Sequence, residues 1–213
     1  MSTAKDLFLM ALDPKPQHPV GQGDLSLALA GAELIDLIEA RTVTLDGDRI
    51  VPGDGAPVPS DGLLAEAASA LTRRPPYERV EDWLWRRGRD LTAAYESALE
   101  GEGRITRTRV GRSPFAPTRL VPAGTPASPT APDPDRHHSA LTTLASLVGL
   151  APPPPTTPPT TPTDDGGPGP GPGTDDATTT VLATVSDAVT ELEAVRQRRS
   201  IENAAFANIW RAP

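Results

Sequence analysis

Residues 24–51 read DLSLALAGAELIDLIEARTVTLDGDRIV, and the hydrophobic pattern changes halfway along this stretch. Its first part is apolar on nearly every side of a helix, with only Ser26, Glu33 and Asp36 forming a narrow polar stripe. A helix that is apolar over most of its circumference belongs in the centre of a helical domain. The stretch therefore predicts a buried central helix, with Asp24 as its N-cap.

The second part of the stretch predicts a short β-hairpin. Polar and apolar side chains alternate in TVTL at residues 42–45, and Asp46-Gly47 is a strong hairpin-turn sequence. Ile50 and Val51 form the expected return strand. An isolated two-stranded hairpin is only marginally stable, so we expect this one to lean on the helices.

Amphipathic patterns on both sides of this stretch predict further helices. Thr3 and Asp6 form a capping box before the apolar run of residues 7–12. Helical spacing of apolar residues recurs at 63–71, 80–85, 91–99, 141–150 and 182–195, and a second hairpin is expected at 104–121. The predicted fold is mainly α: a helical bundle core with surrounding amphipathic helices and one or two short β-hairpins. The residues expected in its core are Leu9, Leu29, Ile35, Leu64, Trp83, Leu99 and Leu144.

A Pro/Thr/Gly-rich tract divides the chain. Residues 151–173 hold 10 of the 26 prolines and no large apolar side chain, so they cannot bury enough surface to offset their ordering entropy. We therefore predict a helical domain at 1–150, a disordered linker at 151–175 and a C-terminal amphipathic helix at 176–213.

Composition and charge limit the expected cellular location of the protein and the kinds of partner that it can bind. The chain has no cysteine, which excludes disulfides and Cys-ligated zinc, and no apolar run approaches the length of a signal peptide or a membrane span. We expect a cytoplasmic protein that can lie peripherally on the inner membrane face. The net charge is −8, yet residues 73–119 hold 11 basic and 7 acidic side chains. A basic middle in an acidic chain indicates an anionic partner, and the alternative is an ordinary solvated surface.

Three arginines in this basic region are the candidate lipid- or anion-binding site. Arg86, Arg87 and Arg89 lie beside Trp83 and Trp85. Guanidinium groups pair well with phosphate, and tryptophan favours the boundary between apolar and polar surroundings, so the cluster suits an anionic membrane surface. Arg86 and Arg89 are three residues apart and can share a helix face.

The alternative is that the tryptophans belong to the core. The arginines would then form ion pairs with acidic neighbours along the chain, namely Glu81, Asp82 and Asp90.

No pattern in the chain indicates catalysis. His137 and His138 are adjacent, so on a helix they point about 100° apart and cannot share a metal comfortably. Glu33 and Asp36 could be acid–base carboxylates, but their spacing equally describes a polar helix stripe. The sequence has no Gly-x-Ser-x-Gly motif and no phosphate-binding glycine-rich loop. We expect no enzymatic activity, no cofactor and no bound metal.

Several motifs, taken in order, resemble the Golgi phosphoprotein 3-like family, which has eukaryotic and actinobacterial members. The most recognisable are Asp6–Leu12, Leu29–Leu37, Leu45–Asp48, Ser60–Leu64 and Asp133–Arg136. The resemblance covers Asp6 to about Leu150. The last third of the chain departs from the family pattern, because the Pro/Thr/Gly tract precedes a single helix.

This resemblance implies a four-helix core, a protruding hairpin used in self-association, and binding of phosphatidylinositol 4-phosphate on membranes. The family's lipid pocket uses a tryptophan, an arginine near the second helix, and two arginines one helical turn apart. In this chain the first arginine becomes Ala30, the tryptophan position falls near Gly21, and the later pair falls near Arg89 and Thr92, so at most one pocket residue is kept.

The sequence therefore predicts a peripheral membrane adaptor of the phosphoinositide-binding type. Its expected partners are an anionic phospholipid headgroup, a second copy through the hairpin at 104–121, and a protein still to be identified. A protein-interaction scaffold of the same fold that has lost lipid binding is the main alternative. A winged-helix-like nucleic-acid binder is a weaker one, because the chain as a whole is acidic.

Overall fold

The computed structural model describes residues 2–12, 20–54, 62–109, 118–123, 134–152 and 172–209. The helices in these ranges are α1 (Thr3–Ala11), α2 (Gln22–Glu39), α3 (Gly62–Ser69), α4 (Val80–Arg87), α5 (Leu91–Gly101), α6 (Pro134–Leu147) and α7 (Pro172–Ile209). The strands are β1 (Val43–Asp46), β2 (Arg49–Pro52), β3 (Ile105–Arg109) and β4 (Thr118–Pro122). The prediction of a mainly α fold with two short hairpins is confirmed.

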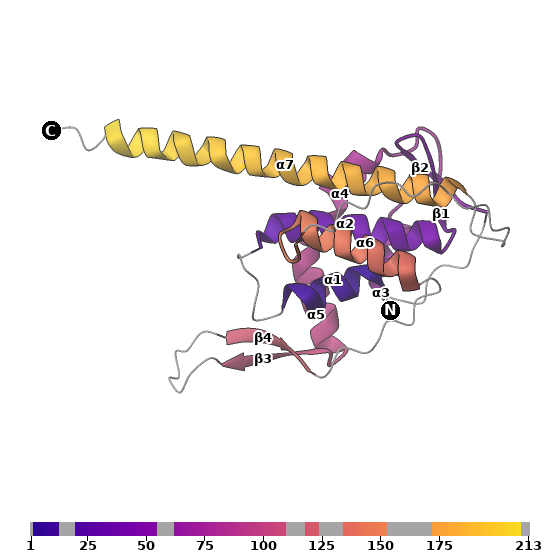
Figure 1. Cartoon of the computed structure of the whole chain (residues 1–213), viewed down its shortest axis with the longest axis horizontal. Helices are drawn as coiled ribbons and strands as arrows, with labels where there is room; N and C mark the ends of the chain where they lie inside the picture. The colour runs from indigo at the N-terminus through magenta and orange to yellow at the C-terminus, as the bar shows by residue number, and fades with distance from the viewer. Residues whose placement is uncertain are drawn as a thin grey trace.

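Helix α2 occupies the centre of the bundle (Figure 1). Every residue from Leu25 to Ile38 is buried, because α1, α3, α4, α5, α6 and α7 all pack against this helix. The polar residues Ser26, Glu33 and Asp36 are buried with the rest. The predicted central helix is thus confirmed, but its polar stripe faces other helices rather than solvent.

The predicted core is confirmed for six of its seven residues. The buried ones are Leu29, Ile35, Leu64, Trp83, Leu99 and Leu144. Leu9 is partly buried and packs against the core from its margin. The reason is that α1 presents Ala4, Leu7 and Phe8 to the bundle, which leaves Leu9 at the margin of that face.

The two predicted helix caps were wrong. Ser2 is the N-cap of α1, and its hydroxyl accepts a hydrogen bond from the Lys5 amide at 3.3 Å. Helix α2 begins at Gln22 after Gly21, and Asp24 lies in its first turn. Thr3, Asp6 and Asp24 instead bind side chains of other helices, so tertiary partners have replaced the local hydrogen bonds that the sequence suggested.

The first hairpin leans on the start of α4, as predicted. β1 and β2 pair antiparallel with Leu45 opposite Ile50, and Gly47 in the turn has a φ of 60°. The amide of Ile50 donates to the Glu78 carbonyl at 2.9 Å, and the amide of Val80 donates to the Asp48 carbonyl at 2.9 Å. These two bonds fix the hairpin to the segment that leads into α4.

The second hairpin extends away from the bundle (Figure 1). β3 and β4 pair antiparallel from Ile105 opposite Pro122 to Arg109 opposite Thr118. Residues 110–117, between the two strands, lie outside the described residues.

Helix α7 lies along α2 and continues past it (Figure 1). Val181 and Val185 are fully buried, and a Cβ atom added to Gly31 would lie 2.5 Å from Cγ2 of Val185. Residues 153–171, most of the predicted linker, lie outside the described residues. The division of the chain into domains near residue 150 stays a prediction. Helix α7 packs directly on α2, the central helix of the part before residue 150.

Candidate functional site

Arg87 ends α4 and points into the bundle. Its guanidinium donates to both oxygens of Glu33, with Nε–Oε2 at 2.8 Å and Nη2–Oε1 at 3.1 Å, and its Nη1 lies 2.9 Å from Oε1 of Glu66. The Tyr95 hydroxyl donates to the same Glu33 carboxylate at 3.0 Å. Burial raises the pKa of the fully buried Glu33, and the bonds from Arg87 and Tyr95 oppose that rise. Arg87 therefore joins α2, α3 and α4 internally.

Arg86 also has intramolecular partners. Its Nε and Nη2 bind the two carboxylate oxygens of Glu78, each at 2.7 Å, and Nη2 reaches the Ala70 carbonyl at 3.3 Å. The guanidinium carbon lies 5.1 Å from the ring centre of Trp83, within range of a cation–π contact. These contacts hold the segment between α3 and α4 against α4, although almost half of the Arg86 side chain stays exposed.

Arg89 differs from its two neighbours. It is exposed, and it has no hydrogen-bond or ion-pair partner in the part of the chain that the structure describes. Because α4 ends at Arg87, Arg89 lies in the turn before α5 and shares no helix face with Arg86. The structure thus does not bring the three predicted arginines together.

The alternative prediction was right about ion pairing and wrong about the partners. Arg86 binds Glu78, and Arg87 binds Glu33 and Glu66. None of these is one of the predicted partners Glu81, Asp82 and Asp90.

The same alternative is confirmed for Trp83 and only in part for Trp85. Trp83 is fully buried, and its Nε1 donates to the Ala30 carbonyl at 3.2 Å. Trp85 is half-buried at the edge of the core.

Arg89 lies near the start of α2. Thr92, three residues further on, donates its amide to Oγ of Ser26 at 3.2 Å, and its hydroxyl donates to the Gln22 carbonyl at 3.3 Å. The first turn of α2 has no side-chain cap. Gly21, Arg89 and Thr92, near which the resemblance placed three pocket positions, therefore lie at the same end of the bundle. We name the surface formed by Gly21, Gln22, Arg89 and Thr92 the α2 end.

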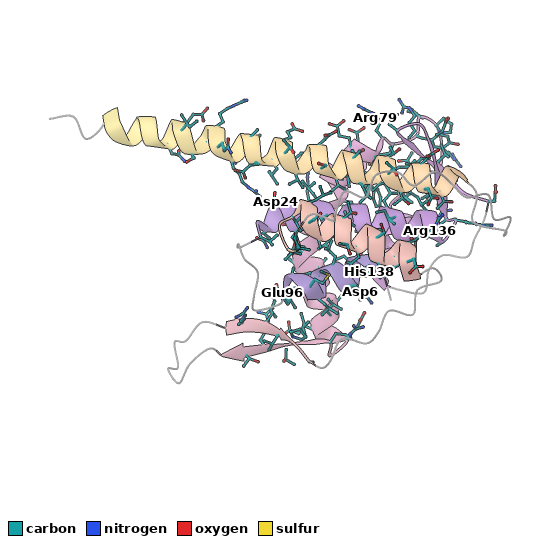
Figure 2. All side chains as sticks on the ribbon, viewed as in Figure 1. Asp6, Asp24, Arg79, Glu96, Arg136 and His138 are labelled. Carbon is teal, nitrogen blue, oxygen red and sulfur yellow. The ribbon has the colours of Figure 1, made fainter. Side chains whose placement is uncertain are left out.

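Helix α7 adds an arginine to the α2 end. Nη1 of Arg196 lies 2.9 and 2.6 Å from the two carboxylate oxygens of Asp24, which lies between α2 and α7 (Figure 2). A Cβ atom on Gly21 would approach Oδ2 of Asp24 and would stand 2.8 Å from Nη2 of Arg196, so a larger residue at 21 would have to displace the ends of these two side chains. Sequence reasoning missed Arg196 because 172 residues separate it from Asp24, and no local pattern marks that contact.

A second buried polar network joins α1, α2 and α6. The Thr3 amide and hydroxyl donate to Oδ1 of Asp36 at 3.1 and 2.6 Å. Oγ1 of Thr3 also lies 3.1 Å from Nδ1 of His137, whose Nε2 lies 3.0 Å from Oδ2 of Asp6. Burial raises the pKa of Asp36 to about 7. His137 is thus a buried structural residue, whereas His138 is exposed.

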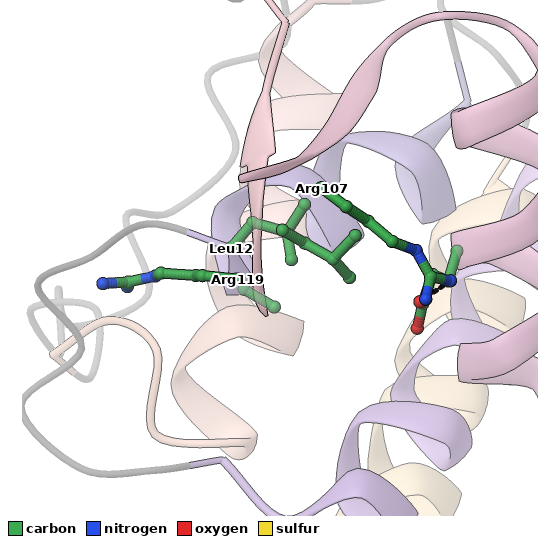
Figure 3. Close-up of a pocket in the computed structure, with 6 residues that line it drawn as sticks. Leu12, Arg107 and Arg119 are labelled. Atoms are coloured by element: carbon green, nitrogen blue, oxygen red, sulfur yellow. Dashed lines mark hydrogen bonds and ion pairs between the residues drawn. The ribbon is translucent and has the colours of Figure 1, made fainter. Parts of the chain in front are cut away.

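A cavity of about 430 Å³ lies between the second hairpin, α1 and α5 (Figure 3). Its lining consists of Ala11, Leu12, Glu96, Arg107, Arg119 and Leu120. Arg107 is bound to Glu96 at 2.7 Å and to Glu100 at 3.1 Å. Figure 3 shows the side chain of Arg119 pointing away from that of Arg107, so the two cations do not converge on one ligand.

Comparison with known proteins gives a family match. The model of the family described as Golgi phosphoprotein 3 (GPP34) matches residues 4–211. A search of curated proteins found no match. Among the helices that the structure describes, none has the length and hydrophobicity needed to cross a membrane.

Proposed function

Since the chain belongs to the Golgi phosphoprotein 3 family, we propose that it is an adaptor without enzymatic activity that docks weakly on anionic phospholipid headgroups. One observation carries the proposal. Arg89 is exposed and has no partner within the described residues, and it lies at the α2 end, near which the resemblance placed three of the family's pocket positions.

The chemistry of the α2 end favours a phosphate group. The free amides at a helix N-terminus carry a partial positive charge that stabilises anions. Arg89 adds a full charge that can form charge-assisted hydrogen bonds with phosphate oxygens. Arg196 lies at the same end, but Asp24 neutralises much of its charge.

The expected affinity is low. Each basic residue near an anionic membrane contributes roughly 1 kcal/mol, and the attraction fades over a Debye length of about 10 Å. Ala30 takes the place of the family's pocket arginine and is fully buried beneath Trp83, so it offers nothing to a ligand. We therefore propose binding to phosphate-bearing headgroups as a class, with phosphatidylinositol 4-phosphate as one member.

Vesicle flotation at two salt concentrations tests this proposal. We expect weak binding to anionic vesicles at low salt, less binding at high salt, and none to neutral vesicles. Arg89→Ala should reduce the binding, whereas Arg119→Ala, which removes an exposed arginine from β4, should leave it nearly unchanged. Absent binding at low salt, or equal losses in the two variants, would contradict the proposal.

A protein-interaction scaffold is the second candidate. The observation in its favour is that Arg86 and Arg87 both serve intramolecular ion pairs, so that Arg89 is the one predicted arginine without a partner among the described residues. A chain that folds normally and binds no vesicle at low salt would support the scaffold.

A further inference from the structure

Three hydrogen-bond contacts join four side chains in series between α1, α2 and α6. They run from Asp36 to Thr3, from Thr3 to His137 and from His137 to Asp6, with heavy-atom distances of 2.6, 3.1 and 3.0 Å. The His137 ring has no further hydrogen-bond partner among the residues that the structure describes. We name these four side chains the proton network, because they have to supply the protons of all three contacts or take them from solvent.

The proton network has too few protons of its own. Each contact needs one proton between its two heavy atoms. The Thr3 hydroxyl supplies one and a neutral His137 ring supplies one, whereas ionised Asp6 and Asp36 supply none. With two protons for three contacts, two acceptor atoms face each other at one point of the series, and a buried acceptor without a donor is costly. All three contacts close only when the network takes up a third proton from solvent, on the ring or on either carboxyl.

Burial favours uptake of this third proton. Thr3 is fully buried and His137 is 2% exposed. Oδ2 of Asp36 is buried and has no hydrogen-bond partner in the described part of the chain, so an ionised Asp36 would leave a charged oxygen without a donor. The same burial raises the pKa of Asp36 to about 7.

The other charged groups on the helices that pack against α6 do not replace the third proton. These helices are α1, α2 and α7. Glu39, on the same helix as Asp36, adds a negative charge that raises the pKa of Asp36 further. Asp135, His138 and Asp176 are exposed. The basic side chains already bind acidic ones, in the pairs Lys5–Glu102, Arg87–Glu33, Arg196–Asp24 and Arg136–Asp175.

We propose that the proton network is a pH-sensitive latch, which holds the start of α6 on α1 and α2 only while it keeps the third proton. His137 lies in the first turn of α6, Thr3 and Asp6 belong to α1, and Asp36 belongs to α2. Loss of the proton therefore breaks a contact between helices and not within one of them.

The latch closes in acid and loosens as pH rises. The pKa of Asp36 is about 7 when the latch is closed and returns towards its ordinary value of 3.8 when the latch opens to water. The closed form thus binds more protons than the open form between about pH 4 and about pH 7, and its stability falls across that range. This inference does not depend on the lipid-binding proposal, which concerns the α2 end.

Amide hydrogen exchange of α6 in the full chain tests the latch. Exchange is measured from about pH 5 to about pH 8 and corrected for the intrinsic rate at each pH. In the wild type, protection should fall as pH rises, by at most about tenfold per pH unit, which is the limit for one proton. Asp6→Asn adds a side-chain N–H that can donate to His137, so all three contacts close without a proton from solvent. At about pH 8, the α6 amides of this variant should exchange about tenfold more slowly than those of the wild type.

The matched control is Asp135→Asn. It makes the same chemical change at an exposed position in the first turn of α6 and should follow the wild type. Circular dichroism at about pH 5 checks that both variants are folded. A second measurement needs no variant: in an NMR titration of the wild type, the side chains of Asp6, His137 and Asp36 should change with one common midpoint, because they share one proton.

Three outcomes would overturn the inference. The first is protection of the α6 amides in the wild type that does not change between about pH 5 and about pH 8. The second is an Asp6→Asn variant that follows the wild type, which would assign the pH dependence to the burial of Asp36 alone. The third is a separate midpoint for each of the three side chains, since each group would then hold a proton of its own.

Discussion

Glu33 is a fully buried carboxylate whose charge is compensated by Arg87 across two helices. A buried ion pair adds little net stability, because desolvation of both groups offsets their attraction. Removing one member, however, leaves the other charged and unpaired in the core. At the scale of single residues, this pair makes α2, α3, α4 and α5 depend on one another, since Glu66 and Tyr95 bind the same two side chains.

Arg87→Ala should therefore be strongly destabilising. We expect the free energy of unfolding, measured by urea denaturation, to fall by about 3–5 kcal/mol because Glu33 loses its cation. Adding Glu33→Gln should recover part of this loss by removing the buried charge. The control is Arg79→Ala, which breaks the exposed pair with Asp48 and should change stability little. Equal effects of the two arginine substitutions would contradict a buried role for Arg87.

Asp36 predicts a pH dependence of stability. Folding raises the pKa of Asp36 from its ordinary value of 3.8 to about 7, so the folded chain keeps a proton that the unfolded chain releases. The free energy of unfolding should then fall as pH rises from about 4 to about 7, by a few kcal/mol at most. Asp36→Asn keeps an oxygen acceptor for Thr3 and should flatten this slope in denaturation curves taken across the range. An unchanged slope in the variant would show that other groups cause it.

Single residues were the least predictable part of the molecule. Glu33 and Asp36 were recognised as polar positions on the central helix, but spacing could not tell a solvent-facing stripe from two buried networks. Their partners Arg87 and Thr3 lie 54 and 33 residues away. Ion pairs across such distances depend on how helices pack, and one sequence does not contain that information in its local pattern.

At the scale of elements, the contact between α2 and α7 depends on a glycine. Gly31→Ala should be destabilising, because its Cβ would stand 2.5 Å from Cγ2 of the fully buried, β-branched Val185. Overpacking of this kind costs about 1–3 kcal/mol, more than the roughly 1 kcal/mol that alanine gains over glycine in a helix. Thermal or urea unfolding measures the difference.

A second glycine provides the matched control for Gly31. Gly101 is the last residue of α5, and a Cβ atom there would meet nothing within 4 Å, so Gly101→Ala should be neutral or slightly stabilising. In a Val185→Ala background the cost of Gly31→Ala should largely disappear. If the cost persists in that background, α7 does not cause it.

Helices and hairpins were predicted well because their signals are local. Each signal lies within a stretch of fewer than about 20 residues. Examples are the apolar run in α2, the Asp46-Gly47 turn and the helical spacing around Trp83. The ends of helices were predicted less well. Thr3 and Asp24 are good capping residues by type, but in the structure each side chain binds another helix, which a local rule cannot anticipate.

At the scale of the whole molecule, α7 decides how the chain is organised. Its helical pattern was visible in the sequence, but the proline-rich tract before it suggested a separate unit. The apolar residues on its inward face cover part of α2, which favours a single folded domain. The family match, which continues to residue 211, agrees with that interpretation. The central claim is therefore that α7 completes the bundle around α2.

Amide hydrogen exchange along α2 tests this claim most directly. The exchange is measured in the full chain and in a chain that ends at Ala151. If α7 completes the bundle, the amides from Leu25 to Ile38 should be strongly protected from exchange in the full chain. They should lose most of that protection in the shorter chain, because the removal of α7 exposes α2 to water. Equal protection of α2 in the two chains would contradict the claim and would show that the first 151 residues form a complete domain.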